Sequence, residues 1–206
     1  VVGDYPSLRV TLLYLNTQKA PMNNPDARRA IVESLDYDGI INGILKGKAK
    51  AMNGPIPRGM WAYDNKAPTF KQNVEQAKAD LAKVPEKITG LNFMYSDKDP
   101  NWEPIGLTLQ AGLQPLGINL KMEKLANATM RERLNTGDFD LAIGSWSPDF
   151  ADPYMFMNFW FDSKLPGLAG NRSFYSNPEV DKLIRESAAT NDQGKRTELY
   201  HQAQKI

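Results

Sequence analysis

The 206-residue sequence contains no cysteine and only one histidine, His201. These absences exclude disulfide frameworks, thiol catalysis and nearly every zinc site built from Cys and His. The 25 Lys and Arg residues almost balance the 24 Asp and Glu residues, which leaves a formal charge of +1. A nearly neutral chain offers no electrostatic reason to bind a polyanion. We therefore expect no nucleic-acid partner, and we expect neither a metal nor a cofactor.

Long apolar runs are also missing, since no stretch approaches the ~18 residues needed to span a bilayer. The chain begins with Val rather than Met, and its last helix, near residues 199–206, carries no C-terminal cap. We expect a piece cut from a longer protein. Hydrophobic residues make up 41% and charged residues 24% of the chain, which is ordinary globular composition. The lack of cysteine fits an exported bacterial protein.

What is present is an alternation of strand-like apolar runs with segments of helical spacing. Strands are predicted over 8–15, 91–95, 118–122 and 139–146, and helices are predicted to begin near Asn24, Asp36, Asn73, Trp102, Asn127, Asp152, Asn177 and residue 195. This order predicts an α/β domain with a mixed, largely parallel sheet flanked by helices. The nearly continuous apolar run at 139–146 is typical of a central strand. Residues 50–70 are rich in Pro and Gly and predict a long loop.

In such domains ligands bind beyond the carboxyl ends of central strands, which here is the segment after Trp146. That segment presents Asp149 beside Phe150 and Tyr154. A carboxylate walled by aromatic rings suits an ammonium group, because ion pairing and cation–π attraction act together. The alternative is that Asp149 is a solvated turn residue. Asp152, which precedes a proline, is better explained as a helix cap.

Several motifs follow one another in a fixed order over nearly the whole chain. They occupy residues 13–16, 24–31, 34–36, 54–57, 77–81, 109–118, 137–140, 146–149, 152–153, 175–178 and 181. With these motifs the chain resembles the peptide-, dipeptide- and nickel-type family of solute-binding proteins of ABC transporters, which also includes receptors for some glycosides.

The resemblance implies one lobe of a two-lobed periplasmic binding protein of type II, whose lobes close over a ligand without chemistry. Residues 1–16 would be a hinge-crossing strand segment, and residues 17–206 the second lobe, with the N-terminal lobe absent. The resemblance further implies a monomeric protein in the periplasm, free or lipid-anchored, that meets the membrane permease of an ABC transporter.

The resemblance also assigns site residues. Asp149, the acid of a Trp-x-x-Asp motif, would take the α-ammonium group of a peptide, and Trp146 and Phe150 would shape the pocket. Lys98 lies in the turn where dipeptide binders hold the ligand carboxylate, but acids on both sides of it favour a solvated lysine. Trp61 and Tyr63 are candidate pocket walls, and equally they would serve to pin the Pro-rich loop.

Other functions stay open on sequence grounds. A glycoside hydrolase would need two carboxyl groups about 5–10 Å apart, drawn from Asp138, Asp140, Asp149 and Asp152. That set is poor, because Asp140 lies in a buried-looking strand and Asp152 resembles a cap. A receptor for an uncharged sugar or a metal chelate, or a regulatory sensor, would use the same fold.

Overall fold

A computed structural model describes residues 7–206 of the chain. Its four-stranded sheet has the order β1-β4-β2-β3. The strands are β1 (Val10–Leu15), β2 (Gly90–Ser96), β3 (Asn119–Leu125) and β4 (Leu141–Trp146). Strand β1 runs antiparallel to β4, whereas β2 pairs in parallel with both β3 and β4. The predicted mixed, largely parallel sheet is confirmed, and β4 lies inside it as expected.

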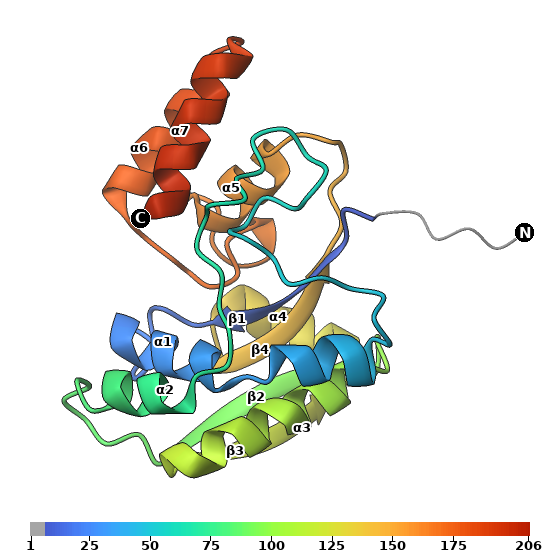
Figure 1. Cartoon of the computed structure of the whole chain (residues 1–206), viewed down its shortest axis with the longest axis vertical. Coiled ribbons are helices and arrows are strands. Elements are labelled where there is room, and N and C mark those ends of the chain that lie inside the picture. The colour runs from blue at the N-terminus through green and yellow to red at the C-terminus, as the bar shows by residue number, and fades with distance from the viewer. Residues whose placement is uncertain (1–6) are drawn as a thin grey trace, which may run out of the picture.

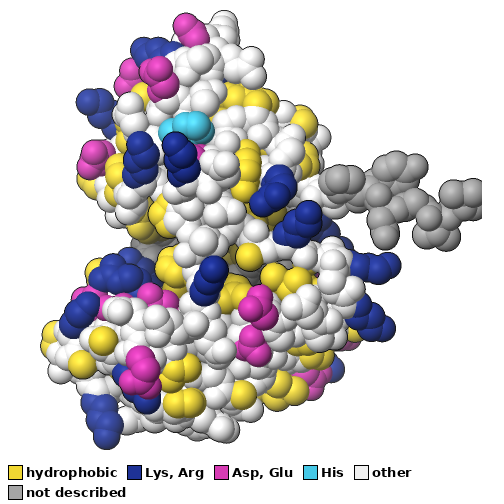
Figure 2. Space-filling model, in the orientation of Figure 1, with side chains coloured by type: hydrophobic (Ala, Val, Ile, Leu, Met, Phe, Trp, Pro, Cys, Tyr) yellow, Lys and Arg dark blue, Asp and Glu magenta, His cyan; other side chains and the backbone are white. Residues whose placement is uncertain are grey.

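Seven α-helices accompany the sheet in the described residues. They are α1 (Pro25–Ser34), α2 (Val74–Leu81), α3 (Trp102–Leu113), α4 (Asn127–Thr136), α5 (Tyr154–Phe161), α6 (Pro178–Ala188) and α7 (Gln193–Lys205). Short 3-10 turns cover Gln114–Leu116 and Gly167–Ala169. Helices α1 to α4 lie around the sheet, while α5, α6 and α7 form a second part at the other end of the molecule (Figure 1). The molecule narrows between these two parts (Figure 2).

Helix starts follow the predicted capping residues in most cases. The Asn24 side chain accepts hydrogen bonds from the first turn of α1, and Asn177 does the same for α6. Helix α4 begins at Asn127, as predicted, but Asn127 does not cap it and no side chain does. The segment after Asp36 forms a π-helix at Gly39–Ile44 rather than an α-helix.

Each of the two parts has its own hydrophobic cluster. The larger one joins the sheet to its helices through fully buried side chains such as Phe93, Leu109 and Leu141. The second joins α5, α6 and α7 to the loop at 50–70, which contributes Ile56. Burying a large apolar side chain contributes roughly 1.5–3 kcal/mol. The predicted loop is therefore irregular in its backbone but anchored through its side chains.

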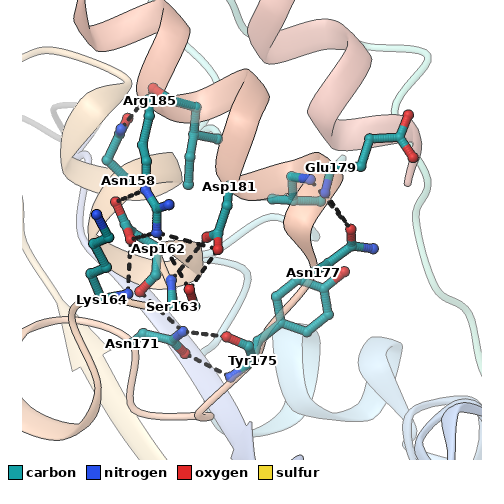
Figure 3. A network of polar contacts seen from close by, with 12 residues as sticks. Asn158, Asp162, Ser163, Lys164, Asn171, Tyr175, Asn177, Glu179, Asp181 and Arg185 are labelled. Carbon is teal, nitrogen blue, oxygen red and sulfur yellow. Dashed lines mark hydrogen bonds and ion pairs between the residues drawn. The ribbon is translucent and has the colours of Figure 1, made fainter.

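A polar network fixes the segment between α5 and α6 (Figure 3). Arg185 forms ion pairs with Asp162 at 2.6 Å and with Asp181 at 3.2 Å. The buried Asn171 amide donates to the carbonyl of Tyr175 and accepts from its backbone N–H. These contacts fix the segment at 162–177, which connects α5 to α6.

Strand β1 belongs to the predicted hinge-crossing segment at 1–16, and residues 1–6 of that segment lie outside the described residues. The strand order makes β1 an edge strand, and it pairs antiparallel with β4. The assignment of this segment to a hinge, and of 17–206 to a lobe, stays a prediction.

Candidate ligand-binding site

The candidate site begins where β4 ends. The first four residues of β4 are buried, and Trp146, its last residue, is half-buried. The Trp146 ring lies 5.5 Å from the ring of Phe159, which in turn meets Tyr154 edge-on at 5.8 Å. Phe150, just beyond the strand, keeps 54% of its surface exposed. The strand thus delivers an aromatic cluster to its carboxyl end, as the sequence predicts.

Two acids follow the strand, and the structure gives them different environments. Asp152 accepts a hydrogen bond from the backbone N–H of Tyr154 at 2.9 Å and pairs with Arg196 through both carboxylate oxygens, at 2.7 and 3.0 Å. The Asp152 carboxylate thus binds the first N–H of α5, as expected of a residue at the helix start, although Pro153 rather than Asp152 occupies the cap position itself. Asp149 is exposed, and within residues 7–206 no hydrogen bond or ion pair engages its carboxylate. Of these two acids, Asp149 is the one whose carboxylate has no partner among the described residues, and its role as a ligand contact stays a prediction beside the alternative of a solvated turn residue.

Arg172, which the sequence does not single out, lies against Trp146 at the end of the strand. Its Nη1 donates to the Tyr14 hydroxyl at 2.8 Å, and its guanidinium carbon lies 5.6 Å from the Tyr14 ring centre and 5.4 Å from the Trp146 ring centre. Burial raises the pKa of the Tyr14 hydroxyl, and the Arg172 charge opposes that shift. Arg172 follows Trp146 by 26 positions, so local sequence patterns carry no signal for this contact.

Lys98 is exposed in the turn after β2. This turn is held by its neighbour Asp99, which pairs with Arg9 at 2.9 Å. The same guanidinium nitrogen of Arg9 donates to the Ser145 hydroxyl at 3.4 Å. The turn therefore lies beside the carboxyl end of β4, but Lys98 itself extends from it with acids on both sides.

Trp61 and Tyr63 are both packed against the second hydrophobic cluster, to which Trp146 also packs. The Trp61 ring lies under the Arg196 guanidinium at 4.7 Å, and the Tyr63 hydroxyl lies 3.1 Å from the side-chain oxygen of Asn53. The Trp61 contact pins the loop at 50–70 to α7, whereas the Tyr63 hydrogen bond joins two parts of the loop itself. A direct role of either ring in a pocket wall stays a prediction.

The acids proposed for a glycosidase are mostly engaged elsewhere. Asp138 pairs with Arg133 at 2.9 Å and Asp140 with Lys19 at 2.7 Å, while Asp152 is held by Arg196. These pairs leave Asp149 without a second carboxylate free to act with it. Among residues 7–206 no cluster of three or more His, Asp or Glu side chains is placed to hold a metal ion. None of the helices described is long and apolar enough to cross a bilayer.

Two hollows in the surface lie apart from the predicted site. One, of about 230 Å³, is lined mainly by apolar side chains of α5 and α7 and by Tyr175. The other, of about 410 Å³, lies between the end of α3 and the start of β3. Neither includes Asp149 or Trp146, and the exposed Asp149 and Phe150 side chains place the candidate site on the surface at the strand end.

The fold has close counterparts among solved structures. A periplasmic binding protein from Helicobacter pylori, described as DppA in complex with peptide STSA, matches 96% of this chain with a TM-score of 0.86 and 27% identity. HbpA2 from Haemophilus parasuis matches 97% with a TM-score of 0.91 and 24% identity. This chain covers only 39% and 40% of those two proteins. The sheet, its helices and the open strand end thus define one lobe of a two-lobed periplasmic binding protein of type II.

The family follows from the sequence comparisons. The model of the bacterial extracellular solute-binding proteins, family 5, matches residues 1–165. The chain belongs to this family, whose members are solute-binding proteins rather than enzymes, so the glycosidase hypothesis finds no support.

Two curated relatives are notable. The "Probable D,D-dipeptide-binding periplasmic protein DdpA" of Escherichia coli is 62% identical over 205 residues, which are 100% of this chain and 40% of the relative. The "Probable di/tripeptide-binding protein 5" of Pseudomonas aeruginosa is 31% identical, with 39% of its length covered. The chain thus spans about two fifths of the length of both relatives.

Proposed function

We propose that this chain is the ligand-binding lobe of a periplasmic receptor that captures short peptides for an ABC importer. The observation that carries the proposal is the 62% identity over the whole chain to a relative named as a D,D-dipeptide-binding protein. Because the chain covers 40% of that relative, the activity belongs to a larger, two-lobed protein. Its partners are the peptide ligand and the membrane permease, and the receptor acts as a monomer.

The proposed mechanism places the peptide ammonium group on Asp149. The acid follows a buried strand, stands next to the exposed Phe150 ring, and has no partner within the described residues. In one lobe alone this carboxylate stays in water, where an ion pair is weak. Closure of a second lobe around the hinge removes that water, so the pair with the ligand ammonium strengthens.

The size of the proposed ligand is taken from the names of the two relatives. Both the D,D-dipeptide and the di/tripeptide names point to peptides of two or three residues. We further propose, from the name of the first relative alone, that the residues of the ligand have D-stereochemistry. A ligand without an ammonium group, such as an uncharged sugar, could donate hydrogen bonds to Asp149 but could not form an ion pair with it.

Isothermal titration calorimetry of the complete receptor tests the proposal. D-Alanyl-D-alanine and L-alanyl-L-alanine are titrated beside N-acetyl-D-alanyl-D-alanine, which lacks the ammonium group. We expect the D,D-dipeptide to bind, and both N-acetylation and the Asp149→Asn substitution to weaken binding by at least about 30-fold, because each removes one partner of an enclosed ion pair.

Asp38→Asn is the matched control, because Asp38 is exposed at the start of the π-helix and makes no capping hydrogen bond. This control is expected to bind like the wild type. Unchanged affinity in Asp149→Asn would reject the assigned residue, and the absence of any dipeptide binding would reject the proposed function itself.

A further inference from the structure

We propose that Arg196 is a positioning residue for the candidate site, which holds the segment at 147–151 in place through its ion pair with Asp152 and so orders the Asp149 carboxylate before a ligand arrives. The inference rests on the proposed function, because it explains how the site assigned to the ligand ammonium group is built. Arg196 lies on α7, 44 positions after Asp152. It acts through Asp152 and does not itself contact the ligand.

The first argument is the geometry of the ion pair. Nη1 of Arg196 donates to Oδ2 of Asp152 at 3.0 Å, and Nη2 donates to Oδ1 at 2.7 Å. The exposed fractions of the two side chains are only 19% and 21%. Two parallel hydrogen bonds fix both the distance and the rotation of a carboxylate, and limited access of water strengthens them. The pair therefore fixes the orientation of Asp152 as well as its position.

The second argument is that Arg196 is itself held by its surroundings. Its guanidinium carbon lies 4.7 Å from the ring centre of Trp61 and 5.8 Å from that of Tyr200. Nη2 also donates to the hydroxyl of the fully buried Tyr200 at 3.3 Å, and this hydroxyl donates to the side-chain oxygen of Asn158 on α5 at 3.2 Å. Stacking and hydrogen bonding of this kind restrict the guanidinium. Arg196 thus joins α7 to α5 and to the loop at 50–70.

The third argument connects Asp152 to Asp149. The backbone N–H of Asp152 donates to the carbonyl of Phe150 at 2.9 Å, and the Asp152 carboxylate accepts from the N–H of Tyr154 at 2.9 Å. Phe150 directly follows Asp149, and Tyr154 is the first residue of α5. An Asp152 side chain fixed by Arg196 therefore fixes the backbone next to Asp149.

The other end of the segment is held as well. Trp146 is the last residue of β4, and its ring lies 5.5 Å from the ring of Phe159 on α5. Residues 147–151 thus form a short connection with both ends held against the same helix. Asp149 lies exposed within it, and no ion pair or hydrogen bond engages its carboxylate within residues 7–206. An ordered carboxylate loses less conformational entropy than a mobile one when it binds an ammonium group.

The test removes both partners of the ion pair in the complete receptor, as Asp152→Asn together with Arg196→Gln. This double variant removes one acid and one base, so the net charge near Asp149 is unchanged and only the tether is lost. Calorimetry measures the affinities for D-alanyl-D-alanine and for N-acetyl-D-alanyl-D-alanine. The ratio of these two affinities reports the contribution of the ligand ammonium group.

We expect this ratio to fall by about 3- to 10-fold in the double variant, because binding must then order the segment that carries Asp149. The affinity for the N-acetylated ligand is expected to change by less than about 2-fold, since that ligand forms no ion pair with Asp149. A purely structural role of Arg196 would instead weaken both ligands equally and leave the ratio unchanged.

Asp162→Asn together with Arg185→Gln is the matched control. This pair also joins an arginine to a carboxylate by two hydrogen bonds, at 2.6 and 3.1 Å, but it links the end of α5 to α6 and includes no residue of 146–152. Thermal unfolding without ligand is expected to show lower stability in both double variants. Only the variant of Asp152 and Arg196 is expected to lower the affinity ratio.

If the variant of Asp152 and Arg196 does not fold, Arg196→Lys takes its place. Lysine keeps the charge but cannot form both hydrogen bonds, so the ratio is expected to fall by at least about 2-fold. An unchanged ratio in the folded variant, or an equal fall of the ratio in the control, would overturn the role of Arg196 and leave the proposed function standing.

The wild type separates the remaining outcomes. If it binds the dipeptide and the N-acetylated form equally well, Asp149 does not bind the ammonium group, and the inference fails while peptide binding stands. If neither ligand binds the wild type, the proposed function fails and the role of Arg196 fails with it.

Discussion

Asp162 is the residue on which the junction of α5 and α6 depends. Its side chain, 13% exposed, accepts from Nε and Nη2 of Arg185 at 3.1 and 2.6 Å (Figure 3). Hydrogen bonding from Arg185 holds the pKa of the Asp162 carboxyl below its ordinary value of 3.8, although burial acts in the opposite direction. The ion pair therefore favours the folded state wherever Asp162 is ionised.

A pH dependence of stability follows from this lowered pKa. The contribution of Asp162 is fully present above the unfolded pKa of about 4, and it is lost as the pH falls through the lower folded pKa. We expect Asp162→Asn to reduce the free energy of unfolding at pH 7 and to have a much smaller effect at pH 2. Urea denaturation of the receptor at both pH values measures this, with Asp38→Asn as a control. An effect of equal size at both pH values would contradict the assigned ion pair.

Single residues were predictable from sequence where their role is local. The hydrogen bond between Asp152 and the N–H of Tyr154 joins residues two positions apart, and the proline between them marks the helix start. The ion pair of Asp152 with Arg196 joins residues 44 positions apart, so no local sequence pattern indicates it. The contacts of Arg172 with Tyr14 and Trp146 were not predictable for the same reason, because only the path of the 162–177 segment brings these residues together.

At the scale of elements, α1 and α3 meet through a glycine. A Cβ added to Gly112 would lie 2.1 Å from the backbone oxygen of Ser34, the last residue of α1. Backbone atoms cannot turn aside as a side chain does, so the two helices would have to separate. Gly112 therefore sets how closely α3 approaches the end of α1.

Gly112→Ala is expected to destabilise the protein by about 1–3 kcal/mol, despite the better helix propensity of alanine. Gly43→Ala is the control, because a Cβ at Gly43 would have no neighbour within 4 Å. Thermal or urea denaturation of both variants measures the difference. A neutral or stabilising Gly112→Ala would show that the helices do not pack this closely.

The order of elements was predictable because strand-like and helical periodicities differ strongly along this chain. Strand β4 is the clearest example, since a fully apolar run specifies a position inside the sheet. The π-helix at Gly39–Ile44 was not predictable, because its spacing of apolar residues resembles that of an α-helix. Helix α4 begins at Asn127 without a side-chain cap, so an Asn near a helix start can be the first helical residue rather than the cap before it.

At the scale of the whole molecule, the exposed surface at the carboxyl end of β4 is what one half of a two-lobed binding site would present. Asp149 and Phe150 are exposed, while the neighbouring Trp146 and Arg172 are held by packing and stacking. A second lobe closing over this surface would supply the missing wall. The fold of the lobe was predictable from this sequence, whereas a complete pocket was not, because the chain spans only about two fifths of the length of its relatives.

A crystal structure of the complete receptor bound to D-alanyl-D-alanine tests the central claim most directly. The account predicts the ligand ammonium within about 3 Å of the Asp149 carboxylate, at the carboxyl end of β4 and enclosed by the second lobe. A ligand bound elsewhere, with the Asp149 carboxylate facing solvent in the closed complex, would contradict it.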